Sequence, residues 1–175
     1  REWSGPWLDA GVACVCEVVM PITDGTIHPP KFAEADALVQ SCLGRDVSIP
    51  APNPRNSVHA AFCDSAVIGV GVATIEYDGS GYLQALAVSP AHRNQGIATE
   101  LIRRRVEWLR NLGVRRVSAH SWCSEAFGPQ SARALAKNGF ELQAVLPLHY
   151  STMSDCPACD SRGCRCDAWL YARDL

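Results

Sequence analysis

The stretch "HRNQGIATELIRRR", residues 92–105, places a polar turn that contains one glycine directly before a strongly helical segment. It follows "YLQALAV", residues 82–88, which has the composition of a strand. A helix that begins near Gly96 after a strand and a turn leaves free backbone N–H groups and the positive end of the helix dipole at one point. Such a point binds phosphate. Gly96 would let a diphosphate approach the backbone, small Ala98 would keep the next turn clear, and Arg93 with its neighbours would neutralise charge.

The charge of the chain is uneven. The formal net charge is −2 and the sequence pI is about 6.2, which gives no overall attraction to nucleic acid or membrane, and we expect neither as a partner. Residues 91–116 nevertheless contain seven arginines and two glutamates. This local excess indicates a small anionic ligand, the alternative being a solvated helix face. Without a Walker lysine or a dinucleotide glycine pattern, nucleotide hydrolysis and NAD binding fit poorly.

Length and composition indicate one globular domain over residues 1–175, because 47% of the residues are hydrophobic. The apolar stretch 10–22 is short, contains Glu17 and follows Glu2 and Asp9, unlike a signal peptide. We therefore expect a soluble cytoplasmic protein. Nine cysteines are an odd number, scattered over the chain, and indicate reduced thiols, some of them metal-bound, rather than a disulfide scaffold.

The residue pattern predicts alternating strands and helices. Short turns at 64–66 and 78–81 predict three consecutive antiparallel strands. Arg105 falls on the apolar face of a predicted helix, so we expect its stem to lie along the protein and its guanidinium to reach solvent. The predicted strands are 14–22, 58–63, 67–77, 82–88, 114–122, 140–146 and 167–175, and the predicted helices are 29–44, 97–112 and 130–138.

The stretch "LAVSPAHRNQGIATELI", residues 86–102, resembles the acetyl-CoA-binding motif of the GCN5-related N-acetyltransferase (GNAT) superfamily, Arg/Gln-x-x-Gly-x-Gly/Ala. Here the motif is Arg93, Gly96 and Ala98. The resemblance covers about residues 58–140 and includes "ALAKNGF", which resembles the helix and Gly-Phe step of the superfamily. It separates a variable N-terminal region, 1–56, from an acetyl-CoA-binding core, 57–140.

The resemblance implies an α/β (α+β) fold with a mixed, mostly antiparallel sheet that is splayed and flanked by helices. It places the pantetheine arm of acetyl-CoA in the opening between strands 82–88 and 114–122. It also implies which backbone groups bind this cosubstrate. Leu86 and Val88 would pair with pantetheine, and the pyrophosphate would be held by the amides of Arg93, Asn94, Gln95, Gly96, Ile97 and Ala98.

Acetyl transfer to an amine needs a neutral amine, stabilisation of an oxyanion and a proton for the departing thiolate. In the superfamily, backbone N–H groups near the position of Val88 polarise the thioester. Strand 82–88 offers Gln84 and no carboxylate, whereas His120 falls on the next strand and could act as a base, the alternative being a hydrogen-bonded histidine of the sheet. Glu125 is a second candidate, unless it is simply solvated.

The usual general acid of the superfamily, a tyrosine, is replaced by Leu135, so water, Tyr150 or Cys123 would have to supply the proton. We expect an N-acetyltransferase that transfers acetyl directly to a primary amine of a small molecule, peptide or protein. The alternative is a non-catalytic acyl-CoA-binding module or an interaction module built on the cysteine-rich loop. The sequence leaves the oligomeric state open, with a dimer as one option.

Four cysteines lie between the last two predicted strands, in the loop 156–166. Cys156, Cys159, Cys164 and Cys166 follow a C-x2-C-x4-C-x-C pattern, which fits a tetrahedral structural zinc site. Two local disulfides and free thiols are the alternatives, and His149 could replace one sulfur.

Overall fold

The computed structural model describes residues 29–51, 53–159 and 163–175. The predicted strand 14–22 lies outside these residues. Seven strands form one sheet, in the order β1-β2-β3-β4-β7-β6, with β5 paired to β4. Among the strands of the described residues, only β3 and β4 run parallel to each other, which confirms the predicted mixed, mostly antiparallel sheet. The strands are β1 (Asn56–Cys63), β2 (Ala66–Ile75), β3 (Gly81–Val88), β4 (Arg116–Ser124), β5 (Gly128–Pro129), β6 (Glu141–Leu146) and β7 (Asp167–Asp174).

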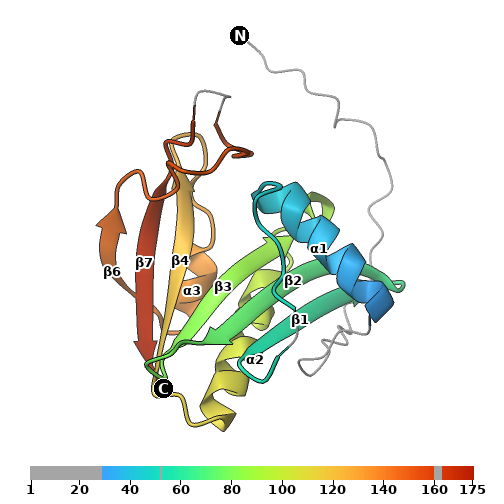
Figure 1. The fold of residues 1–175 in the computed structure, drawn as a ribbon, viewed down its shortest axis with the longest axis vertical. Helices are drawn as coiled ribbons and strands as arrows, with labels where there is room; N and C mark the ends of the chain where they lie inside the picture. The colour runs from blue at the N-terminus through green and yellow to red at the C-terminus, as the bar shows by residue number, and fades with distance from the viewer. Residues whose placement is uncertain (1–28, 52, 160–162) are drawn as a thin grey trace.

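Helices cover both faces of the sheet (Figure 1). Helix α1 (Pro29–Leu43) packs on β2 and β3, and α2 (Ile97–Asn111) packs against β1, β2 and β3 on the other face, beside α3 (Ala132–Lys137). A 3₁₀ turn, Pro90–His92, joins β3 to α2. None of the helices in the described part of the chain is both long and apolar enough to cross a membrane.

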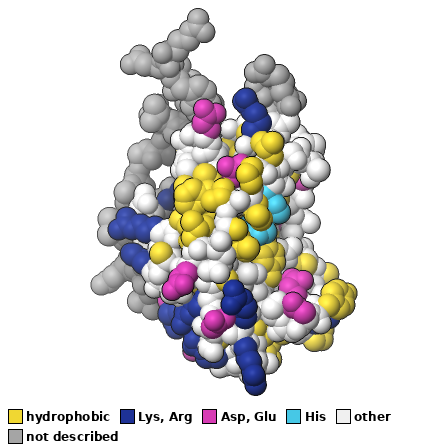
Figure 2. Space-filling view, turned by 90° about the vertical axis from the view of Figure 1, so that its left-hand side faces the viewer, with side chains coloured by type: hydrophobic (Ala, Val, Ile, Leu, Met, Phe, Trp, Pro, Cys, Tyr) yellow, Lys and Arg dark blue, Asp and Glu magenta, His cyan; other side chains and the backbone are white. Residues whose placement is uncertain are grey.

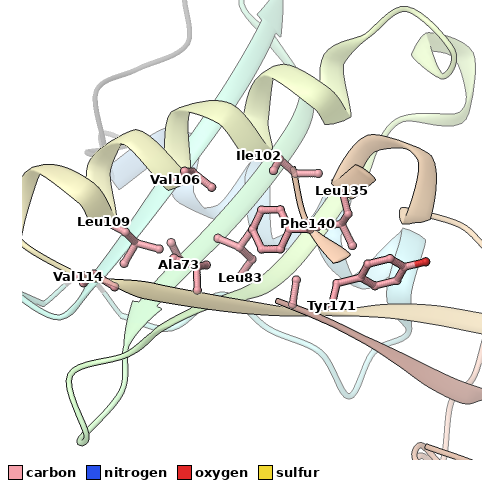
Figure 3. Packing of buried hydrophobic residues seen from close by; sticks show 11 residues of the cluster. Ala73, Leu83, Ile102, Val106, Leu109, Val114, Leu135, Phe140 and Tyr171 are labelled. Carbon is pink, nitrogen blue, oxygen red and sulfur yellow. The ribbon is translucent and has the colours of Figure 1, made fainter. Parts of the chain in front are cut away.

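Alternation along the strands divides the core into layers, because successive side chains point to opposite faces. Val70 and Val72 pack with the α1 residue Val39. The largest cluster lies between the sheet and helices α2 and α3, where Leu83 faces Ile102 and Phe140 (Figure 3).

The pairing between β3 and β4 is short. Only Gly81, Tyr82 and Leu83 pair with β4, at Val117–Ala119, and the register of β3 against β2 shifts between Val72 and Ala73. After Leu83, β3 no longer pairs with β4. The sheet therefore opens between these two strands, as the family resemblance implies.

Arg105 differs from the prediction. Its side chain does not reach solvent: the residue is 1% exposed. Nη1 donates to Val72 O at 3.0 Å and to Ala85 O at 2.8 Å, and Nε donates to Leu101 O at 3.1 Å. Burial lowers the pKa of the guanidinium to about 9, so the group remains a cation at neutral pH. The carbonyls of Val72 and Ala85 lie where the register of β2 against β3 shifts. They take the place of the water molecules that would otherwise solvate the guanidinium.

Candidate active site

The turn before α2 leaves backbone N–H groups free. Asn94 and Gly96 have left-handed backbones, with φ of 63° and 85°, and Gly96 is the N-cap of α2. The first bond of the helix runs from Glu100 N to Gly96 O at 3.1 Å, so the amides between them have no partner within the helix. A Cβ built on Gly96 would meet no atom within 4 Å. This helix start is open to an anion such as a diphosphate.

The side chains of this turn are arranged around the open glycine. Arg93, Asn94 and Gln95 are exposed, whereas Ile97 is buried and anchors the helix start in the core. Arg93 Nε donates to Val88 O at 3.3 Å. The arginine expected beside a phosphate therefore lies next to the end of β3.

The free edge of β3 faces the opening of the sheet. Ser89 N donates to Ile68 O on β2 at 2.9 Å. Because successive N–H groups of a strand point to opposite edges, the amides of Val88 and Leu86 point to the edge that β4 leaves after Leu83. These are the two residues that the sequence predicts to pair with an extended ligand arm.

His120 lies on the other face of the sheet from α2. Val117 and Ala119 pack into the core against α2 and α3, so the alternation along β4 turns His120 to the α1 side. The parallel register pairs Tyr82 with Ser118 and brings Tyr82 Oη to 3.2 Å from His120 Nδ1.

The environment keeps both groups neutral at pH 7. Burial lowers the pKa of His120 below its usual value near 6.5, and the neighbouring His149 lowers it further. Burial raises the pKa of the Tyr82 hydroxyl. A neutral imidazole can accept a proton, which a protonated one cannot.

Aromatic rings continue from His120 along the loop after β6. The His149 ring centroid lies 4.8 Å from that of His120, Tyr150 lies 5.0 Å from His149, and Trp122 lies 5.2 Å from Tyr150. His149, which the sequence left as a possible metal ligand, is therefore placed beside His120.

Edge strand β6 borders this region. Figure 2, which views the molecule from this side, shows hydrophobic side chains gathered next to histidine. The large hydrophobic residues exposed on β6 and the turn after it are Leu142, Val145 and Leu148.

The remaining predicted residues lie elsewhere. Glu125 is exposed after β4 and lines a cavity of about 330 Å³ with Cys159 and Arg165. Leu135 is buried in the core cluster, away from solvent. Cys123 lies on β4 opposite Asp167, and burial raises the pKa of its thiol.

The structure brings the four loop cysteines together. The sulfur atoms of Cys156, Cys159, Cys164 and Cys166 all lie within 4.8 Å of one another, and all four thiols are free. Cys63 is disulfide-bonded, in contrast to the expectation of reduced thiols.

Comparison with known proteins identifies the fold and the family. A family model described as the Acetyltransferase (GNAT) family matches residues 29–140. The chain belongs to this family. No curated protein sequence matches the chain.

Solved structures of other GNAT proteins have the same fold. The ribosomal-protein-S18-alanine N-acetyltransferase of Escherichia coli is 15% identical, with a TM-score of 0.66 over 89% of this chain and 94% of that one. The IAA acetyltransferase of Bacillus cereus is 18% identical, with a TM-score of 0.64 over 90% and 99%. A putative streptothricin acetyltransferase of Bacillus anthracis, solved with acetyl coenzyme A, is 16% identical, with a TM-score of 0.54 over 70% and 64%. These structures show that the fold is shared, and membership of the GNAT family supports acetyl transfer from acetyl-CoA in general.

Sequence reasoning missed the contacts of Tyr82, His149 and Arg105. The sequence contained one usable signal: Tyr82 and His120 lie on neighbouring predicted strands. Their contact depends on the register between β3 and β4, which no local pattern of residues specifies.

Proposed function

We propose that this GNAT protein transfers an acetyl group from acetyl-CoA directly to a primary amine of a small molecule, peptide or protein. The observation that carries the proposal is the position of His120, a neutral imidazole on the α1 side of the opening, across the sheet from the open start of α2 at Gly96. Acetyl donor and amine would then approach the opening from opposite faces.

The residues at the α2 start fit the diphosphate of acetyl-CoA. Gly96 leaves the space above its Cα free, and the amides of the first helical turn have no partner within the helix. Leu86 and Val88 present their amides on the free edge of β3 and would hold the pantetheine arm. Bound acetyl-CoA supplies the activated acetyl group as a thioester.

His120 would take the proton of the attacking amine. A new C–N bond replaces the C–S bond, one proton passes from the nitrogen to His120 Nε2, and a proton returns to the sulfur to give the CoA thiol. Tyr82 Oη lies 3.2 Å from His120 Nδ1. With the ring proton on Nδ1 and donated to this oxygen, the Nε2 lone pair would be free to take the proton of the amine. Glu125 remains a second candidate for the base, although it lies in the exposed turn after β4.

We also propose that the four-cysteine cluster binds a zinc ion. This ion would lie away from the acetyl-CoA-binding residues and would have a structural role. A cytoplasmic location stays a prediction from the sequence.

A thiol-release assay tests the function. The purified protein is incubated with acetyl-CoA and matched pairs of acceptors, each pair consisting of a free amine and the same molecule with a blocked nitrogen. We expect CoA release with at least one class of free amine and none with its blocked partner. Acetyl-CoA binding without acceptor-dependent release in any pair would support a non-catalytic acyl-CoA-binding module instead.

A further inference from the structure

We propose that Cys156, Cys159, Cys164 and Cys166 bind one zinc ion, and that this ion fixes the segment 148–155 over the acceptor side of the sheet. The metal site stands on the cysteine geometry alone. The role given to the segment rests on the proposed function.

The spacing of the sulfur atoms is that of a metal site. Tetrahedral Zn–S bonds of about 2.3 Å place sulfur atoms about 3.8 Å apart. Cys166 Sγ lies 3.8 Å from Cys156 Sγ and 3.6 Å from Cys159 Sγ. A disulfide joins only two sulfur atoms, at about 2.05 Å. Because Cys166 is equally near two others, the cysteines form one cluster rather than two pairs.

The backbone around the cluster directs N–H groups at sulfur. Cys159 N donates to Cys156 O at 3.3 Å, which closes the C-x2-C turn. Arg165 N lies 3.4 Å from Cys159 Sγ, and Cys166 N lies 3.4 Å from Cys164 Sγ. Amide donors of this kind stabilise the negative charge of thiolate ligands and fix their orientation.

Two of the four cysteines are buried, where a thiolate is stable only if a cation and hydrogen bonds compensate its charge. Cys164 and Cys166 are 4% and 1% exposed. The Nε1 of Trp122 is buried, and its N–H lies within reach of the Cys166 sulfur. A metal-bound thiolate on Cys166 would accept this N–H, whereas a disulfide sulfur is a weak acceptor.

The segment before Cys156 is docked on the end of α1. Asp46 accepts hydrogen bonds from Ser154 N at 2.8 Å, Ser154 Oγ at 2.8 Å and Asp155 N at 3.1 Å. Arg45 Nε donates to Asp155 Oδ2 at 2.9 Å. The segment thus reaches the C-terminal end of α1 and ends at the first cysteine of the cluster.

The other end of the segment is tied to the β4 side. Asp167 directly follows Cys166, the last cysteine of the cluster. Its carboxylate accepts a hydrogen bond from Leu148 N at 2.9 Å. His149 and Tyr150 pack against His120 and Trp122 of β4. A metal that joins both ends of the loop 156–166 would hold this segment beside His120.

Metal content tests the site without reference to activity. Protein purified without chelator is analysed for zinc, alongside the Cys159→Ser and Cys166→Ser variants and a Cys42→Ser control, whose free thiol lies on α1. We expect about one zinc per chain in the wild type and the control, and little in the two cluster variants. Metal-free wild-type protein with two disulfides among the four cysteines, found by mass spectrometry after anaerobic purification, would overturn the site. So would an equal loss of zinc in the control.

Hydrogen exchange tests the role of the ion. Removing zinc with a chelator should raise exchange at amides of 148–155 and leave the amides of α2 protected. With an accepted amine, the KM for the amine should rise by about tenfold or more, with unchanged affinity for acetyl-CoA. Unchanged exchange in 148–155 would overturn the role. If the zinc-bound protein acetylates no amine, the proposed function fails, whereas the zinc and exchange results still decide the metal site.

Discussion

Tyr82 Oη and His120 Nδ1 lie 3.2 Å apart, although the two residues are separated by 38 positions in the sequence. The contact forms because β3 and β4 run parallel over a short register at their N-terminal ends. It assigns Tyr82 a positioning role, since the bond to Nδ1 decides which nitrogen of His120 holds a free lone pair.

Tyr82→Phe removes the hydroxyl that lies 3.2 Å from His120 Nδ1, and its effect should appear in kcat. We expect kcat to fall by about tenfold, since correct positioning of a base contributes part of the about 10²- to 10⁴-fold effect of general base catalysis. The affinity for acetyl-CoA should not change. Tyr77→Phe is the matched control, because Tyr77 is 97% exposed. Steady-state kinetics check this, and equal effects of both variants would contradict the positioning role.

His120→Gln should lower kcat/KM by about 10²-fold or more at neutral pH and remove one limb of the pH profile. In the wild type, activity should fall as the pH drops through the pKa of His120, because the imidazolium cannot accept a proton. Burial and His149 lower this pKa, and Tyr82 on β3 is neutral, so the limb lies below about pH 6.5. The rise toward high pH that comes from deprotonation of the amine should remain in both proteins. An acid limb that persists in the variant would favour Glu125 or water as the base.

Gly96→Glu should weaken acetyl-CoA binding by about 10²-fold or more. The new carboxylate would lie next to the negatively charged diphosphate, and bringing like charges together costs several kcal/mol. Gly79→Glu is a close control: Gly79 has a similar φ of 83°, and a Cβ there also meets no atom within 4 Å. Both variants carry the same strain and charge, but only one places them at the start of α2. Calorimetric titration measures the affinities, and equal affinities in two folded variants would contradict the site.

Arg105→Lys should lower the free energy of unfolding by about 1–3 kcal/mol. Lysine lacks the planar group that reaches Leu101, Val72 and Ala85 at once. Arg110→Lys, on the exposed side of α2, should change the free energy by less than about 0.5 kcal/mol. Urea unfolding of both variants measures the difference. A stable Arg105→Lys protein would show that the three carbonyl bonds contribute little.

Local sequence signals predicted most of the fold. The start and end of α2 follow from Gly96 and Gly113, which both have left-handed backbones. The cysteine cluster was also predictable, because its four cysteines lie within eleven residues and a turn alone brings them together.

The contacts that sequence reasoning missed are long-range. The buried position of Arg105 depends on carbonyls of β2 and β3 where the register shifts, a feature of the assembled sheet. Helical periodicity placed Arg105 on the apolar face, but a cation there is normally expected to reach solvent. The pairing of Tyr82 with His120 likewise depends on strand register.

Direct acetyl transfer is the central claim, and a single-turnover reaction tests it most directly. The protein is mixed in excess with acetyl-CoA that carries an isotope-labelled acetyl group and with an amine, quenched at intervals, and both protein and amine are examined by mass spectrometry. The proposal predicts that label appears on the amine nitrogen as CoA is released, that the protein stays unlabelled throughout, and that the His120→Gln variant is slower. Label that accumulates first on the protein, or CoA release without labelled amine, would contradict it.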